Sequence, residues 1–112
     1  MVALNAKEAL PDIIAFEWDG GNLRKNRLKH GVEPRECEEV FFNKPFLIDE
    51  DVTHSHGERR MRALGQTHRQ RRLFVVFTLR EGKIRIVSAR DQSRKERAVY
   101  KKWERTGHEK ET

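Results

Sequence analysis

The sequence has little of what marks an exported or membrane-bound protein. It contains one cysteine, Cys37, which excludes an internal disulfide and is typical of proteins kept in the reducing cytosol. No apolar run approaches the roughly 18 residues that a membrane helix needs. The N-terminus also lacks the basic segment and apolar block of a signal peptide. We therefore expect a cytoplasmic protein that makes no use of a membrane.

Apolar residues are also scarce, at 36% of 112 residues against 38% charged ones. A chain of this length forms one hydrophobic core, so we expect one compact domain with a densely charged surface. The expected boundaries are a leader over residues 1–12, the domain over residues 13–105 and a polar tail over residues 106–112.

Positive charge is concentrated in the second half of the chain. Residues 1–56 contain 7 Lys/Arg and 11 Asp/Glu, whereas residues 57–112 contain 17 Lys/Arg and 7 Asp/Glu. Arginine is the commoner cation in that half, and its planar guanidinium matches phosphate oxygens. The asymmetry favours a polyanion as partner, nucleic acid above all. The alternative is a basic surface that is solvated or covered by an acidic protein.

The most apolar stretch, residues 72–90, predicts a β-hairpin. β-Branched and aromatic residues fill both of its runs, and the only breaker is the pair Glu81-Gly82 between them. A two-residue turn there gives one wholly apolar face for the helices, formed by Leu73, Val75, Phe77, Leu79, Ile84 and Ile86. The same register puts Arg90 on the helix side, and it puts on the other face Phe74, Val76, Thr78, Arg80, Arg85, Val87 and Ala89.

Weaker patterns predict the remaining elements. Hydrophobic periodicity and capping residues give, in order, a strand at 13–18, a helix at 22–30, a helix from Pro34, a strand from Phe46, a strand at 58–64, the hairpin and a last helix capped by Ser93. Cys37, Val40 and Phe41 should be buried on the second helix, and Val99 and Trp103 on the last. The order β-α-α-β-β-β-β-α with short connections predicts an α+β fold, a small antiparallel sheet with its helices on one face.

Several short motifs share their order and spacing with one protein family. They are Phe16-Glu17-Trp18-Asp19, Asn26, Lys29-His30-Gly31-Val32, His54-Ser55, Glu58-Arg59, Thr78-x-Arg80, Ile84-Arg85-Ile86-Val87-Ser88-Ala89-Arg90, and Glu96-Arg97 with Tyr100. Over about residues 14–101 the chain resembles the BrnT toxins. The resemblance implies a RelE-like fold and an endoribonuclease toxin of a type II toxin-antitoxin system, which cleaves RNA and inhibits translation.

The resemblance also implies partners. The cognate antitoxin is expected to be BrnA-like, an acidic or ribbon-helix-helix protein that covers the basic half of the chain. Such antitoxins dimerise and bind operator DNA, so a two-plus-two hetero-oligomer is expected. The chain departs from the family at Asn22, four residues after the Trp, where the family commonly carries a lysine. If that lysine serves cleavage, this chain is a weaker nuclease or uses Arg24, Lys25 or Lys29 instead.

RNA cleavage without a metal needs a base for the ribose 2′-OH, donors for the charge on phosphorus and an acid for the leaving oxygen. Arg80 and Arg90 are the first candidates for the phosphate, because strand ends position a guanidinium firmly and its paired N–H groups match two oxygens. The alternative is that they form strand-end ion pairs with Asp91, Glu81 or Glu96.

Proton transfer has two kinds of candidate. Glu58 is the candidate base, but it can equally serve to orient Arg59 or Arg60. His54 and His56 have the pKa range that suits acid–base chemistry near neutrality, although surface histidines are mostly inert.

Further residues are candidates for holding RNA. Trp18 is suited to base stacking, with burial beside the first strand as the alternative. The remaining RNA-binding candidates are Arg24, Lys29, Arg60, Arg85 and Tyr100. We expect no metal and no cofactor, because His54, His56 and Cys37 fit no common zinc spacing and one cysteine cannot build a closed site.

Two other functions share the same charge pattern. A non-enzymatic nucleic-acid-binding protein would tolerate loss of Glu58 and the histidines. A degenerate toxin would survive as an antitoxin-binding module or co-repressor, and Asn22 is the feature that favours this alternative.

Overall fold

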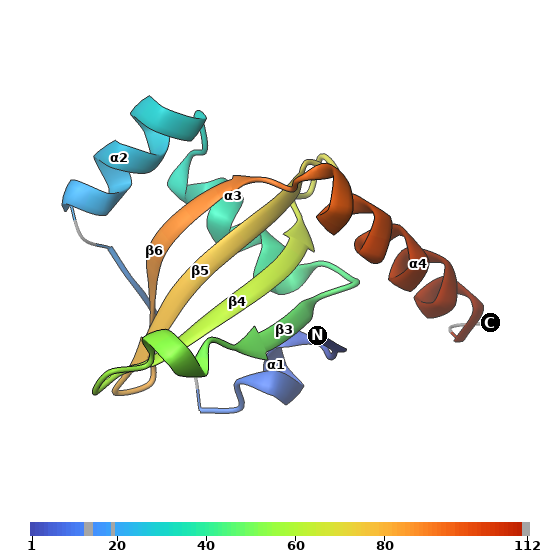
Figure 1. Cartoon of the computed structure of the whole chain (residues 1–112), viewed down its shortest axis with the longest axis horizontal. Helices are drawn as coiled ribbons and strands as arrows, with labels where there is room; N and C mark the ends of the chain where they lie inside the picture. The colour runs from blue at the N-terminus through green and yellow to red at the C-terminus, as the bar shows by residue number, and fades with distance from the viewer. Residues whose placement is uncertain (13–14, 19, 111–112) are drawn as a thin grey trace.

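The structure, a computed structural model, describes residues 1–12, 15–18 and 20–110, apart from the side chains at 22–23, 26–28 and 106–110. Within this part, six strands form one sheet in the order β1-β3-β4-β5-β6-β2 (Figure 1). The strands are β1 (Val2–Ala3), β2 (Ala15–Glu17), β3 (Leu47–Glu50), β4 (Arg59–Gln66), β5 (Arg72–Arg80) and β6 (Lys83–Asp91). The helices are α1 (Ala6–Ala9), α2 (Gly20–His30), α3 (Pro34–Glu39) and α4 (Arg94–Lys110), with 3-10 turns η1 (Val40–Phe42) and η2 (Val52–His54).

The predicted hairpin is confirmed as the centre of the sheet. β5 and β6 are antiparallel and are joined through Glu81 and Gly82, whose φ angles of 51° and 76° are those of a two-residue turn that matches strand twist. Leu73, Val75 and Phe77 are fully buried. The apolar face of the hairpin therefore lies in the core, as predicted.

A β-bulge changes the register in the middle of the hairpin. Val76 pairs with Ser88 whereas Phe77 pairs with Ile86, so Val87 is an extra residue in β6. Beyond it the alternation is reversed: Ala89 is buried opposite Val75 in the core. Arg90 lies opposite Phe74 on the other face. The predicted faces of Ala89 and Arg90 are thus wrong, because a strict two-residue period has no place for an inserted residue.

The sheet is mixed, and both of its faces carry a helix. β2 pairs in parallel with β6, with Phe16 beside Ile84. α3 and η1 pack on the face of Val75 and Phe77, whereas Tyr100 of α4 packs with Leu64 and Phe74 on the opposite face. The α+β class is confirmed, but the fully antiparallel sheet with helices on one face is wrong. The early strand β2 is placed beside the last strand, which gives a parallel neighbour.

α3 is held close to the sheet. Pro34 stands at its start, and Glu33 and Glu36 form a reciprocal capping box. Cys37, Val40 and Phe41 are all buried, as predicted. Gly65 of β4 permits the approach, because a Cβ there would lie 2.8 Å from the Cβ of Val40.

Both ends of the chain are tied to the sheet. The stretch predicted as a leader contributes β1, which pairs with β3, and α1, which is capped by Asn5. At the other end, the Ser93 Oγ accepts the Glu96 N–H at the start of α4. Tyr100 is buried and Trp103 packs beside it, whereas Val99 is 45% exposed, so only the predicted burial of Val99 is wrong. None of the described helices has the length and apolar character needed to span a membrane.

Candidate functional site

The face of the sheet opposite α3 carries a row of polar side chains near the hairpin turn. In the strand register Arg60 of β4 lies beside Thr78 of β5, and Thr78 lies beside Arg85 of β6. Paired residues on neighbouring strands point to the same side and are about 5 Å apart. Three adjacent strands therefore present two arginines and a hydroxyl within a span of about 10 Å.

Arg80 and Glu58 extend this row toward the turn. Arg80 is two residues beyond Thr78 on β5, and its Nη2 forms an ion pair with Glu58 Oε1. Its hydrogen bond is the main reason that the pKa of Glu58 is lowered, with smaller contributions from Thr78 and Arg85. Glu58, Arg60, Thr78, Arg80 and Arg85 thus form one group, which we call the sheet-face cluster.

The ion pair limits what Glu58 can do. Its lowered pKa keeps the carboxylate ionised near neutrality but makes it a weak base. The alternative role of orienting an arginine is met, but the arginine is Arg80, since Arg59 pairs with Glu50 at 2.9 Å. Arg80 remains 48% exposed, so its guanidinium is oriented and still open to a ligand.

His54 is linked to the cluster through Asp51. The His54 Nδ1 lies 2.9 Å from Asp51 Oδ2, and that same oxygen lies 3.7 Å from the Nε of Arg60. Although desolvation opposes it, hydrogen bonding by His54 lowers the pKa of Asp51. The carboxylate holds one ring nitrogen, so the other is directed outward from an exposed ring, an arrangement common to oriented catalytic imidazoles.

The Arg60 guanidinium is the other uncommon feature of this group. Its Nε is buried and makes no hydrogen bond within the described part of the chain. A buried donor without a partner costs free energy. The Asp51 carboxylate, 3.7 Å away, compensates its charge without forming a hydrogen bond.

Arg90 lies far from Arg80, at the opposite end of the hairpin. It pairs with Phe74 in the register, and Arg80 is six positions farther along β5, or about 20 Å away. The Arg90 guanidinium binds Glu96 at 2.8 Å and stacks 4.3 Å over the Phe74 ring. A single site that contains both arginines is therefore wrong. The strand-end ion pair with Glu96, named as the alternative from the sequence, is what forms.

Two aromatic candidates for RNA binding pack in or against the hydrophobic core. Tyr100 is fully buried, its hydroxyl donates to the Pro45 carbonyl at 2.5 Å, and burial raises its pKa. It has no surface on which a base can stack, so its assignment to RNA binding is wrong. Trp18 packs against the core and donates from Nε1 to Glu38 at 2.8 Å, which is the structural alternative stated for it.

α2 presents exposed cations beside β6. Arg24 and Lys29 are exposed on it, whereas the side chain of Asn22 lies outside the described residues. The end of α2 is held by Arg71, whose guanidinium donates to the carbonyls of His30 at 3.3 Å and Gly31 at 3.0 Å. α2 is thereby fixed against the end of the sheet.

Sequence reasoning missed the importance of Arg71. It also binds Asp91 at 2.8 Å and Glu36 at 3.2 Å. Its hydrogen bond to Asp91 is the main reason that its own pKa is raised and that of Asp91 is lowered. One arginine therefore joins α2, α3 and β6, and its place in a run of basic residues gave no signal of this role.

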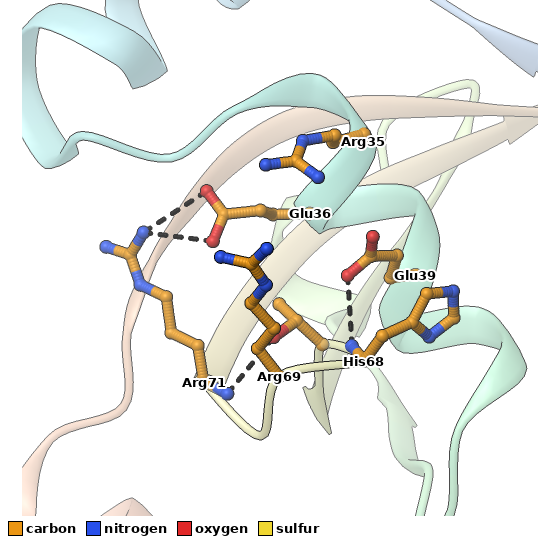
Figure 2. Close-up of a pocket in the computed structure, with 7 residues that line it drawn as sticks. Arg35, Glu36, Glu39, His68, Arg69 and Arg71 are labelled. Carbon is orange, nitrogen blue, oxygen red and sulfur yellow. Dashed lines mark hydrogen bonds and ion pairs between the residues drawn. The ribbon is translucent and has the colours of Figure 1, made fainter.

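A shallow hollow of about 410 Å³ lies beside this junction, between α3 and the β4–β5 loop (Figure 2). Its lining consists of Arg35, Glu36, Glu39, Thr67, His68, Arg69 and Arg71. The carboxylate of Glu36 binds Arg71, and that of Glu39 accepts the His68 backbone N–H at 2.9 Å. The charges here are largely balanced within the hollow, so the sheet-face cluster is the better candidate site.

The described residues contain no group of three side chains placed to hold a metal ion. Cys37 lies in the core, and burial raises the pKa of its thiol to about 12. It therefore remains a neutral thiol and is unsuited to bind a metal, which requires the thiolate.

Comparisons with known proteins agree with this architecture. The family model described as "Ribonuclease toxin, BrnT, of type II toxin-antitoxin system" matches residues 18–96. The structure of the Brucella abortus ribonuclease toxin BrnT is similar in fold, with a TM-score of 0.54 and 20% identity, over 72% of this chain and 99% of that one. A comparison with curated protein sequences gives no match. The family model covers most of the chain, and the chain therefore belongs to the BrnT family of ribonuclease toxins of type II toxin-antitoxin systems.

Proposed function

We propose that this protein is an endoribonuclease that cleaves RNA without a metal and so inhibits translation, with its active site at the sheet-face cluster. The observation that carries the proposal is the convergence of Arg60, Arg80 and Arg85 with Glu58 on an open face of the sheet. Guanidinium groups on adjacent rigid strands suit the dispersed charge of a phosphoryl transition state.

Each member of the cluster has a proposed task. Arg80, oriented by Glu58, binds the scissile phosphate. The partly exposed guanidinium of Arg60 binds a phosphate oxygen, and Arg85 binds the adjoining charge. His54 is the better-suited proton carrier, because Asp51 holds its Nδ1 and Glu58 has a lowered pKa.

The exposed cations of α2 are proposed to hold the RNA backbone outside the reacting group. Lys29 and Arg24 lie on a helix that Arg71 fixes to the sheet, so their positions relative to β6 are defined. They contribute to affinity and do not touch the reacting atoms. We assign Arg90 no catalytic role, because it lies about 20 Å from Arg80.

Single substitutions at the two hairpin ends test the proposal. Wild type, Arg80→Ala and Arg90→Ala are each induced in cells, and growth and total RNA are followed. The purified proteins are also incubated with a defined RNA in the presence of EDTA. Arg80→Ala is expected to lose at least 100-fold in cleavage rate, as removal of one transition-state donor does. Arg90→Ala is expected to keep activity as far as it stays folded, which circular dichroism checks. The assignment fails if wild-type protein leaves RNA intact. It also fails if a folded Arg90→Ala loses cleavage activity while Arg80→Ala keeps it.

The antitoxin is proposed to be a ribbon-helix-helix dimer that covers the sheet-face cluster and binds operator DNA as part of a two-plus-two assembly. The exposed arginine of the cluster and the net charge of +6 support an acidic partner. Co-expression with the product of the adjacent gene tests this by gel filtration. Charge reversal at Arg80 should release the antitoxin, and an assembly that is unaffected would place the interface elsewhere.

One observation favours the alternative of a toxin that binds without cleaving. The Glu58 carboxylate is tied to Arg80 and has a lowered pKa, which suits a binding site better than a proton acceptor. In that case the wild-type protein binds RNA or antitoxin while RNA stays intact. The same EDTA incubation separates the two functions, and His54→Ala should then leave growth unchanged.

A further inference from the structure

The last helix, α4, extends from the end of β6 away from the body of the sheet (Figure 1). It is attached by one side only, through buried Tyr100 and half-buried Trp103, which pack with Leu47, Leu64 and Phe74. Apart from Glu96 and Glu104, which also face the sheet, the remaining described side chains of α4 are exposed. A helix held by so narrow a contact has most of its circumference free to meet another molecule.

The carboxylates of α4 face the sheet. Within the described side chains of the helix, Glu96 binds Arg90 at 2.8 Å and Glu104 binds Arg72 at 2.7 Å. Both carboxylates are neutralised by arginines of the hairpin. They are therefore unavailable to balance the cations on the outward side of the helix.

Those cations form a continuous line. Arg94, Arg97, Lys101 and Arg105 follow one another at intervals of three, four and four residues, which places them on one flank of an α-helix. All four are exposed. At 1.5 Å per residue the line is about 16 Å long. We call these four residues the α4 ridge.

The ridge is unfavourable for the helix itself. Arg97 and Lys101, and Lys101 and Arg105, are like charges at i, i+4, which repel each other. Arg94 stands in the first turn, where the helix dipole favours an acid. Within the described structure only Arg97 has a compensating attraction, to the Asp91 carboxylate, so a polyanion bound along the line would relieve the remaining repulsion.

We propose that the α4 ridge binds the phosphate backbone of a base-paired RNA stem. Binding of single-stranded RNA commonly uses exposed aromatic side chains on which bases stack. The described part of the ridge has none, since Tyr100 is buried and Trp103 packs inward. Recognition of paired RNA relies mostly on the shape of the helix and on contacts to its phosphates and 2′-hydroxyls, and a line of exposed cations supplies the phosphate contacts. The proposal rests on the proposed function, because it takes RNA as the polyanion.

The position of α4 places the ridge near the same sheet face as the sheet-face cluster. Tyr100 packs on the sheet face that also carries the sheet-face cluster, at the far end from the turn. A stem bound at α4 would therefore leave its unpaired flank free to lie along that face toward Arg80. The ridge holds a structured RNA while the cluster acts on the strand beside the stem.

Binding to a 2′-O-methyl RNA stem-loop tests the proposal, because this probe has no free 2′-OH and cannot be cleaved by its attack. The variant is Lys101→Gln/Arg105→Gln. The matched control is Arg35→Gln/Arg69→Gln, which also removes two exposed cations that form no ion pair in the described structure. Affinity is measured by fluorescence anisotropy at several salt concentrations between 50 and 300 mM, a range chosen around physiological ionic strength.

The ridge variant is expected to lose about tenfold in affinity for the stem at 0.1 M salt. The slope of log K against log salt should become shallower by about 0.9 for each lost phosphate contact, or about 1.8 in all. The control should change both quantities by much less.

Three results would overturn the assignment. The first is that the control variant loses as much affinity for the stem as the ridge variant. The second is that the ridge variant loses as much affinity for an unpaired RNA strand of the same length. The third is that it loses as much affinity for a DNA stem that wild type binds as tightly as the RNA stem. Because the probe is not cleaved, a protein that binds the stem through α4 yet cleaves no RNA refutes the proposed function alone. Cleavage with no effect of the ridge substitutions on binding refutes this inference alone.

Discussion

Replacing Gly65 by alanine is expected to destabilise the protein by forcing β4 away from the helical layer. The added Cβ would lie 2.8 Å from the Cβ of Val40 and 3.3 Å from its carbonyl oxygen. Carbon atoms prefer about 3.5–4.0 Å, so close to 1 Å of separation must open. Side-chain rotation cannot relieve the contact, because both atoms of Val40 are fixed to the backbone.

Overpacking of this kind costs about 1–3 kcal/mol. A loss of about 2 kcal/mol in a domain of this size lowers the Tm by roughly 10 °C. Thermal unfolding followed by circular dichroism measures the shift, and urea unfolding gives the free energy. Gly20→Ala is the matched control: it lies at the start of α2 with nothing within 4 Å of its Cβ, and should be neutral or slightly stabilising. If Gly65→Ala is as stable as wild type, η1 does not pack on β4 as described.

Three other outcomes follow from buried or paired groups. Tyr100→Phe removes the hydrogen bond to the Pro45 carbonyl and should cost about 1 kcal/mol in urea unfolding while RNA cleavage is unchanged. Arg71 lowers the pKa of Asp91 below its ordinary 3.8, so this pair stabilises the fold above about pH 4 and the contribution is lost as the pH falls through the folded-state value. The free energy of unfolding should therefore fall less steeply below pH 4 in Arg71→Met than in wild type. Cys37, with a pKa of about 12, should resist alkylation by iodoacetamide at pH 8 until urea unfolds the protein, and rapid labelling of the native state would contradict its burial.

Much of the fold could be predicted because local rules agree with the tertiary structure. In the hairpin the apolar alternation, the β-branched residues and the Glu81-Gly82 turn all indicate the same register up to Ile86. The burial of Cys37 and Val40 followed from helical spacing alone. Where several independent local signals predict the same structure, tertiary contacts do not change that structure.

The failures have a common physical cause, which is that long-range pairing is not encoded in short windows. Val87 has no unusual sequence signal, yet its insertion as a bulge reverses the faces of Ala89 and Arg90. The parallel placement of β2 beside β6 likewise depends on where distant segments meet. The alternation of apolar and polar residues predicts which face of the sheet a residue occupies only where the strand has no bulge.

Part of the candidate site could be found from the sequence, and part could not. Arg60 and Arg85 were both candidates, and the register brings them together on either side of Thr78. Arg90 was chosen as a strand-end arginine, but each strand of a hairpin has two ends and the motif does not distinguish them. The ion pairs that orient Arg80 and the Asp51 carboxylate beside His54 appear only when β4 is laid beside β5.

The parallel pairing of β2 with β6 also sets a condition on how the protein is made. Phe16 meets its partner Ile84 only after the intervening helices and strands have been synthesised and the hairpin has formed. Closing so long a loop costs chain entropy before any contact repays it, so pairings of this kind tend to form late and slow the folding of the whole domain. β6 also carries Arg85. A nascent chain therefore lacks both the β2–β6 pairing and part of its proposed site until almost the entire chain has been synthesised.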